Sequence, residues 1–330
     1  MDDLVARVRE LPGLEDFLRL PSLERLRSAA AHGPVVVVNT STVRCDALVV
    51  TRTDVRTVPL PGLHLAGDGG LIDRAEALLN ALALVGRSPA DAWRAQRILT
   101  RTLAWLWDTV AAPVLDALPD TPAPSRLWWC PTGLLTLFPL HAAGHYSGAH
   151  RDSLPDRHVC SYTTTLRALA AARSRPAPAP AAPRVPAVDQ SDTPGLPRLP
   201  HAAAEVRRLS GRLPRTTVLT GAQATREKLL NTLPDHPYLH FSGHGTQDPT
   251  DPSGGALYLH DHERSGPLTV ADISRLRLAD ARLAYLSACE TARGAATLPD
   301  EAAHLAGTSS NYAARTATPL WWAAYVHTGP

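Results

Sequence analysis

The chain lacks the features of membrane, secreted and nucleic-acid-binding proteins. Its 33 basic and 31 acidic residues leave a formal net charge of +2, which gives no electrostatic basis for binding nucleic acid or a membrane surface. The start, Met1-Asp2-Asp3-Leu4, has no basic segment followed by an apolar one, so no signal peptide is expected. The longest apolar stretches, around 133–143, are far shorter than the ~20 residues that a membrane-spanning helix needs.

Cysteine is also scarce, with four residues in the chain: Cys45, Cys130, Cys160 and Cys289. They are widely spaced and form no C-x-x-C pair, which argues against a zinc ribbon and against a dense disulfide framework. A cytoplasmic protein with reduced thiols is therefore expected. The first three cysteines are predicted to be inert thiols packed in the core, as free cysteine behaves as a small apolar residue.

What is present is the composition of a soluble globular protein. Apolar residues make up 44% of the chain and charged residues 19%, unlike a disordered sequence. A chain of 330 residues is long enough for one large domain or two ordinary ones.

The N-terminal half predicts helices, then strands, then helices again. Residues 1–32 are expected to form short helices as a lead-in segment, since Pro12-Gly13 and Pro21 interrupt the periodicity. A domain part over 33–171 follows. It begins with three apolar runs that predict antiparallel strands: Val35–Val38, Ala47–Val50 and Val55–Leu60.

Further along, residues 71–118 have long helical periodicity, with Trp105 and Trp107 expected to pack in the core or against a partner. The apolar positions on one face of this region are Leu99, Leu103, Leu106 and Val110. Leu134–Leu140 is predicted to be a strand that pairs with residues 127–130 around the turn Pro131-Thr132-Gly133.

A Pro/Ala-rich region separates the two halves of the chain. Residues 172–186 consist largely of alanine and proline, and we predict an exposed linker over 172–200. After it, 201–330 alternates short strands with helices, which predicts a mostly parallel sheet covered on both faces. Thr225 is expected to cap a helix over 226–233, and Thr269 to open another with a capping box.

A histidine and a cysteine, 45 residues apart, each follow a short apolar run in this part of the chain. His244 comes after Tyr238-Leu239-His240-Phe241-Ser242-Gly243, and Cys289 after Leu283-Ala284-Tyr285-Leu286-Ser287-Ala288. Such runs are typical of buried parallel strands, whose carboxyl ends gather functional groups at one edge of the sheet. If the two strands are neighbours, a general base lies beside a thiol nucleophile, with the amides of Gly245 and Cys289 placed to form an oxyanion hole.

These motifs resemble those of the CHAT domain, a caspase-like cysteine peptidase domain often fused to tetratricopeptide repeats. The resemblance includes His-Phe-Ser-Gly-His-Gly, Leu-Ser-Ala-Cys-Glu-Thr-Ala, the block Trp128–Ala143 and the segment Leu298–Gly307, and extends over about 33–307. It implies a caspase-like three-layer α/β/α sandwich with a mostly parallel sheet. It also implies endopeptide hydrolysis by a Cys289–His244 dyad, with Gly245 in the oxyanion hole and no metal or organic cofactor.

The chain departs from the family pattern near its C-terminus. Gly307 is followed by Thr308–Arg315 without an apolar strand, and Trp321–Pro330 resembles the usual last strand, so the C-terminal subdomain is expected to be shortened by an internal deletion. Two alternatives to a peptidase therefore stay open. One is a degenerate, inactive scaffold in a signalling or defence assembly, and the other is an acyltransferase that uses the same dyad.

Substrate and partners are less well defined by the sequence. A protein or peptide substrate is expected, together with a regulatory protein partner and with neither nucleic acid nor membrane. Glu290, Asp300 and Glu301 are candidates for a pocket that accepts a basic P1 residue, although a helix cap or a solvated surface explains each of them as well. His260-Asp261-His262-Glu263 has two metal-ligand types in a short segment but no third ligand at a recognised spacing, which favours a surface loop and no metal site.

Overall fold

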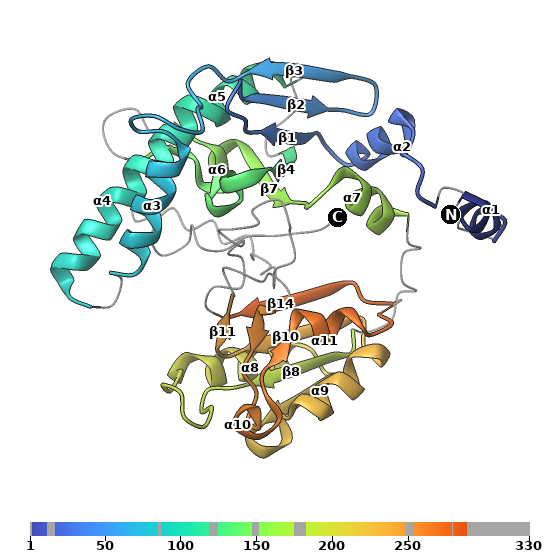
Figure 1. Ribbon diagram of the computed structural model, residues 1–330. Coiled ribbons are helices and arrows are strands. Elements are labelled where there is room, and N and C mark those ends of the chain that lie inside the picture. The colour runs from blue at the N-terminus through green and yellow to red at the C-terminus, as the bar shows by residue number, and fades with distance from the viewer. Residues whose placement is uncertain are drawn as a thin grey trace.

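The computed structural model describes residues 2–11, 17–84, 87–118, 125–146, 152–174, 183–247, 254–278 and 280–288. These residues form a mixed α/β structure with two principal sheets, one from each half of the chain (Figure 1). Within the described ranges, no helix combines the length and apolar character needed to cross a membrane.

The first sheet has five strands in the order β3-β2-β1-β4-β7. Their bounds are β1 (Val35–Asn39), β2 (Asp46–Val50), β3 (Val55–Pro59), β4 (Ser125–Pro131) and β7 (His158–Tyr162). The first three are antiparallel neighbours, which confirms the prediction for this region. β4 lies parallel to β1 and to β7, because helices connect these strands along the chain.

Helices cover both faces of the first sheet. One face packs against α3 (Leu71–Leu82) and against an uninterrupted helical run made of α4 (Pro89–Leu106), the π-helical turn η2 (Trp107–Ala111) and α5 (Ala112–Ala117). The predicted apolar face is confirmed, since its four residues and Trp107 belong to the buried core. The other face packs against the 3₁₀ turn η1 (Ser28–Ala30) and α7 (Leu166–Arg173), and α2 (Leu23–Arg27) contacts both of these elements.

The adjacent residues Trp128 and Trp129 of β4 serve these two faces separately. Side chains alternate along a strand, so Trp129 enters the cluster beneath α4 and Trp128 the cluster beneath α7. Both indoles are fully buried, and the Arg173 guanidinium lies 4.2 Å from the centre of the Trp128 ring.

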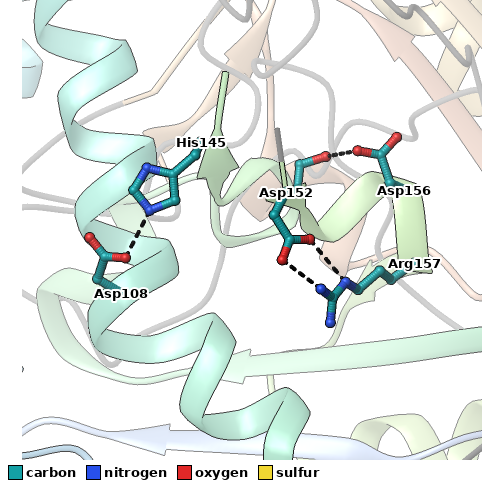
Figure 2. Close-up of polar contacts among 6 residues, drawn as sticks. Asp108, His145, Asp152, Asp156 and Arg157 are labelled. Atoms are coloured by element: carbon teal, nitrogen blue, oxygen red, sulfur yellow. Dashed lines mark hydrogen bonds and ion pairs between the residues drawn. The ribbon is translucent and has the colours of Figure 1, made fainter. Parts of the chain in front are cut away.

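A group of surface contacts surrounds the π-helical turn (Figure 2). The turn immediately precedes a helix whose second residue is Pro113, which has no N–H for the regular helical ladder. Asp108 on this turn pairs with His145 of β5 (Gly144–His145), with 2.8 Å between Oδ1 and Nε2. Beside it, Arg157 at the end of α6 (Leu154–Arg157) binds both carboxylate oxygens of Asp152 in β6 (Asp152–Ser153). These side chains are substantially exposed, so each pair contributes about 1 kcal/mol or less.

The strand predicted over Leu134–Leu140 is wrong. The chain forms 3₁₀ turns there, η3 (Gly133–Leu137) and η4 (Leu140–Ala142). Gly133 adopts a φ of +57°, which turns the chain sharply after β4, and the buried Leu135 and Phe138 follow a spacing of three residues. A spacing of three fits a 3₁₀ turn and not the alternation of a strand.

The second sheet has four strands in the order β14-β10-β8-β9, and all neighbours are parallel. Their bounds are β8 (Val185–Asp189), β9 (Thr216–Thr220), β10 (Tyr238–Ser242) and β14 (Leu283–Ser287). One face packs against α8 (Pro200–Arg212), and the other against the apolar side chains of α9 (Arg226–Thr232) and α11 (Val270–Ser274). The structure thus has the caspase-like α/β arrangement with a parallel-dominated sheet and helices on both faces.

The predicted linker over 172–200 is wrong for the residues of β8. This strand is buried and lies between β9 and β10 in the second sheet. Pro186 is tolerated there because the Val185 N–H donates to the Arg215 carbonyl, so the Pro186 nitrogen faces the β10 side, where pairing begins only at Ala187. The region is rich in proline and alanine, so the short apolar run of β8 does not stand out in the sequence.

Local helix signals in this half are confirmed. The Thr225 hydroxyl accepts a hydrogen bond from the Lys228 N–H at the start of α9, and Thr269 and Asp272 form the capping box of α11. Asp272 also binds Arg226 of α9, with 2.7 Å between the guanidinium and the carboxylate. This ion pair links α9 to α11, the two helices that cover one face of the sheet.

Candidate functional site

The strands that precede His244 and Cys289 are parallel neighbours, which meets the condition set by the sequence analysis. Ser242 of β10 pairs with Ser287 of β14, and the Gly243 N–H extends the ladder by donating to the Ser287 carbonyl over 3.1 Å. In the sequence His244 and Cys289 each come two positions after the Ser242–Ser287 pair. Cys289 itself lies outside the described residues, whereas the strand that leads to it is in register with the strand that leads to His244.

The His244 imidazole is oriented by a main-chain carbonyl. Its Nε2 lies 2.7 Å from the carbonyl oxygen of Pro197. Because a carbonyl can only accept a hydrogen bond, this contact assigns a proton to Nε2, and in the neutral imidazole the lone pair is then on Nδ1. The ring is half-buried at the carboxyl end of β10, so Nδ1 is the nitrogen available to act as a base.

Pro197 belongs to a loop of residues 190–199 that connects β8 with α8 and is held against β10. The Gln190 N–H donates to the Ser242 carbonyl over 2.9 Å, and the Gln190 side chain is buried. Its amide oxygen accepts a hydrogen bond from the Thr193 hydroxyl, and the Leu199 N–H donates to the Ser191 carbonyl. These contacts help to hold the loop that presents the Pro197 carbonyl.

Gly243 permits the close approach of this loop to β10. A Cβ atom at this position would lie 2.6 Å from the Gln190 Cβ and 2.9 Å from the Phe241 ring, much closer than van der Waals contact. Any larger residue would therefore displace either the loop or the strand just before His244.

Gly245 has a backbone direction that suits an oxyanion donor. It begins β11 (Gly245–Thr246), which pairs with β12 (Ala256–Leu257) in a small sheet completed by β13 (Leu268–Thr269). Since the Tyr258 N–H donates to the His244 carbonyl, Gly245 and Leu257 form a non-hydrogen-bonded antiparallel pair. In such a pair each residue's own N–H points away from the partner strand.

A polar cluster lies next to the site, between β10 and α8, with His240 and Ser242 buried and Glu205 partly exposed. The Ser242 hydroxyl donates to Oε2 of Glu205 over 2.8 Å, and Nε2 of His240 lies 3.5 Å from Oε1 of the same carboxylate. The His240 ring stacks on the Tyr285 ring of β14 with 4.8 Å between centroids. Burial lowers the pKa of His240, and the nearby Glu205 carboxylate opposes this shift in part.

The lowered pKa of His240 predicts a dependence of stability on pH. The unfolded chain binds a proton at His240 near the ordinary pKa of ~6.5, whereas the folded chain does so only at lower pH. The free energy of unfolding should therefore fall as the pH drops below about 6.5 and level off below the folded pKa. Urea denaturation at several pH values should show a shallower fall in His240→Gln.

The control for this measurement is the exposed His64, whose replacement by glutamine should leave the pH dependence unchanged. Some dependence should remain in His240→Gln, because burial also lowers the pKa of His158. An unaltered pH dependence in His240→Gln would contradict the prediction.

The described cysteines are poor nucleophiles. Cys45 and Cys130 are buried, with their thiols directed at main-chain carbonyls. Burial raises the pKa of Cys130 to about 11 and that of Cys160 to about 12. This agrees with the prediction that these thiols are inert.

The remaining candidates from the sequence are not brought into a site by the described residues. Glu290, Asp300, Glu301 and the shortened segment after Gly307 lie outside the described residues. In the segment 260–263, Asp261 accepts a hydrogen bond from the Arg226 N–H, and the His262 ring lies against the Leu259 carbonyl. No group of three or more metal-ligating side chains occurs in the part of the chain that the structure describes.

The sequence did not reveal the contacts of Pro197 and Glu205. A carbonyl oxygen is common to every residue, so no side-chain signal marks Pro197 as a partner of His244. Glu205 lies on α8, and its contact with a strand residue 37 positions away has no local signature.

The parallel sheet, its covering helices and the residues at its carboxyl edge define a caspase-like α/β protein. A family model for the CHAT domain matches residues 100–310, well over half of the chain. The protein therefore belongs to the CHAT domain family, which is related to the caspase-like peptidases. A comparison with curated proteins found no match.

Proposed function

We propose that the protein is a caspase-like cysteine endopeptidase in which Cys289 is the nucleophile and His244 is the base. The observation that supports this most is the orientation of His244. Its Nε2 is engaged by Pro197, and it follows a strand in register with the strand before Cys289. An oriented imidazole beside a thiol is the arrangement that cysteine-dependent acyl transfer requires.

In the proposed reaction, Nδ1 of His244 removes the proton from the Cys289 thiol. The thiolate attacks the carbonyl carbon of the scissile peptide, and the carbonyl π electrons move to its oxygen. The resulting oxyanion accepts hydrogen bonds from the N–H groups of Gly245 and Cys289, each worth on the order of 100-fold or more in rate.

Collapse of this intermediate breaks the peptide C–N bond, and His244 donates its proton to the departing amine. Water, deprotonated by His244, then hydrolyses the thioester and restores the thiol. Throughout the cycle the Pro197 carbonyl accepts the Nε2–H bond and stabilises the transient imidazolium. This chemistry uses no metal or organic cofactor.

The substrate is proposed to be a protein, and activity is proposed to depend on a regulatory protein partner in the cytoplasm. Glu290, Asp300 and Glu301 are the candidates for a pocket that accepts a basic P1 residue. A preference for Arg or Lys at P1 that is weakened in Glu290→Gln, Asp300→Asn or Glu301→Gln would identify the residue that lines this pocket.

The function is tested by incubating the full chain with a diverse peptide library and identifying the cleaved bonds by mass spectrometry. Cleavage should disappear in Cys289→Ala and persist in the matched control Cys45→Ala. Cleavage that survives in Cys289→Ala would refute the proposed nucleophile. Absence of cleavage by the folded wild-type chain would support the inactive scaffold or an enzyme that requires its partner, and transfer of acyl groups only to added amines would support an acyltransferase.

A further inference from the structure

Two hydrogen bonds connect the end of β10 with α8 and with the loop just before it. One is the hydrogen bond between the Pro197 carbonyl, just before the helix, and His244, just after the strand. The other joins Glu205 on the helix to Ser242 at the end of the strand. The segment around α8 therefore makes two contacts with the segment around β10. One orients His244, the proposed base, and the other is the charge-assisted hydrogen bond between Glu205 and Ser242.

The Glu205–Ser242 tie lies in a well-packed part of the sheet. Ser242 is 2% exposed and His240 is 7% exposed, so the strand side of the tie is closed to water. A buried hydroxyl that loses its partner pays the full cost of desolvation, which makes such a bond difficult to exchange. Hydrogen bonds to a carboxylate are also among the stronger ones in proteins.

Three neighbouring elements, α8, β14 and β8, contribute polar or aromatic side chains around the Glu205–Ser242 hydrogen bond. From α8 comes Glu205, and from β14 comes Tyr285, whose ring stacks on His240. From β8 comes Asp189, which is opposite Ser242 in the ladder and accepts a hydrogen bond from the Ser191 N–H through its own carboxylate. The Glu205 carboxylate is therefore the group that connects α8 to the polar side chains of β10.

We propose that Glu205 is a positioning residue that holds α8 against β10 and thereby keeps the Pro197 carbonyl on Nε2 of His244. The proposal rests on the proposed function in so far as His244 acts as the base. The loop that contains Pro197 leads directly into α8, so loss of the Glu205–Ser242 bond is expected to let the start of α8 and the Pro197 carbonyl shift relative to β10. A displacement of about 1 Å is enough to reduce the efficiency of an oriented catalytic group.

The tie can be broken from either side, by Glu205→Ala or by Ser242→Ala. Glu205→Gln serves as the conservative variant, because its amide oxygen still accepts the Ser242 hydroxyl proton. Glu227→Ala, an exposed glutamate on α9 at the other face of the sheet, is the matched control. The double variant with both alanines should behave like either single variant, because each removes the same bond.

The first readout is the ¹⁵N chemical shifts of the His244 ring in the full-length protein, assigned by their loss in His244→Gln. The wild type and Glu205→Gln should show a protonated Nε2 and an unprotonated Nδ1. In Glu205→Ala and Ser242→Ala the two shifts should approach each other as the tautomers mix. The second readout is the rate of iodoacetamide alkylation at Cys289 as a function of pH, measured on its tryptic peptide. The rate at pH 7 should fall about tenfold in both alanine variants.

Unchanged His244 shifts and an unchanged alkylation profile in folded Glu205→Ala and Ser242→Ala would overturn the proposal. A Glu205→Gln variant as impaired as the alanine variants would also overturn it. Loss of the native amide spectrum in the alanine variants would do so as well, since the bond would then support the fold as a whole. If alkylation of Cys289 in the wild type is independent of His244, the proposed function fails, whereas the ring shifts still report on the role of Glu205.

Discussion

Replacing His244 by alanine should lower the cleavage rate at pH 7 at least 1000-fold while leaving the fold intact. Removing the base leaves a thiol of pKa ~8.5 that is mostly protonated, and it also removes the acid that protonates the departing amine. The base and the acid act on successive steps of the same reaction. The combined loss in rate should therefore exceed the ~100-fold at the lower end of what one acid–base group contributes. His244 is half-buried and follows the end of β10, so little packing is lost.

The measurement is kcat/KM on a cleaved peptide, together with the pH dependence of Cys289 alkylation. In His244→Ala the midpoint of alkylation should move up toward that of an ordinary thiol. His64→Ala, an exposed histidine of the first half of the chain, should match the wild type in both assays. Retention of most of the cleavage activity in His244→Ala would exclude this histidine as the base.

Replacing Phe241 by alanine should destabilise the second sheet by about 3–5 kcal/mol. The ring is fully buried among the apolar side chains of α9, α11 and the neighbouring strands, and it lies against Gly243. Its removal leaves a cavity next to the Ser242–Ser287 pair, which aligns the two strands of the site. Phe241→Leu fills more of this space and should cost substantially less.

Hydrogen exchange followed residue by residue checks this expectation. Protection of the β8 and β10 amides should fall in Phe241→Ala, whereas that of β1 and β4 should change little, because the two sheets are built on separate apolar clusters. An equal loss of protection in both sheets would show that they unfold as one cooperative unit and would contradict the prediction.

Features encoded by neighbouring residues were predictable from the sequence. The strand of His244 was recognised as a short apolar run, and Thr225 and Thr269 were identified as caps because a hydroxyl at the start of a helix binds N–H groups within one turn. The parallel direction of the strands also followed, since alternating strands and helices favour a parallel sheet, whereas the adjacency of the two strands near the site was only a condition that the structure meets.

Features that depend on tertiary context were missed. β8 was assigned to a linker because its buried run is short and lies in a region rich in proline and alanine. The stretch after Gly133 was assigned to a strand because its apolar residues are dense, and the positive φ that redirects the chain has no signal beyond the glycine itself. The Glu205–Ser242 bond depends on how α8 lies on the sheet, which no local pattern determines.

The contact between His244 and the Pro197 carbonyl has a consequence for mutational scanning. Replacing Pro197 by alanine removes a ring but retains the carbonyl, so a scan of single substitutions would record little effect at this position and would assign importance to His244 alone. The hydrogen-bond acceptor is a main-chain carbonyl, whose position is set by the conformation of the loop and not by any side chain. Changes in loop length between residues 190 and 199 are therefore the alterations that would expose it.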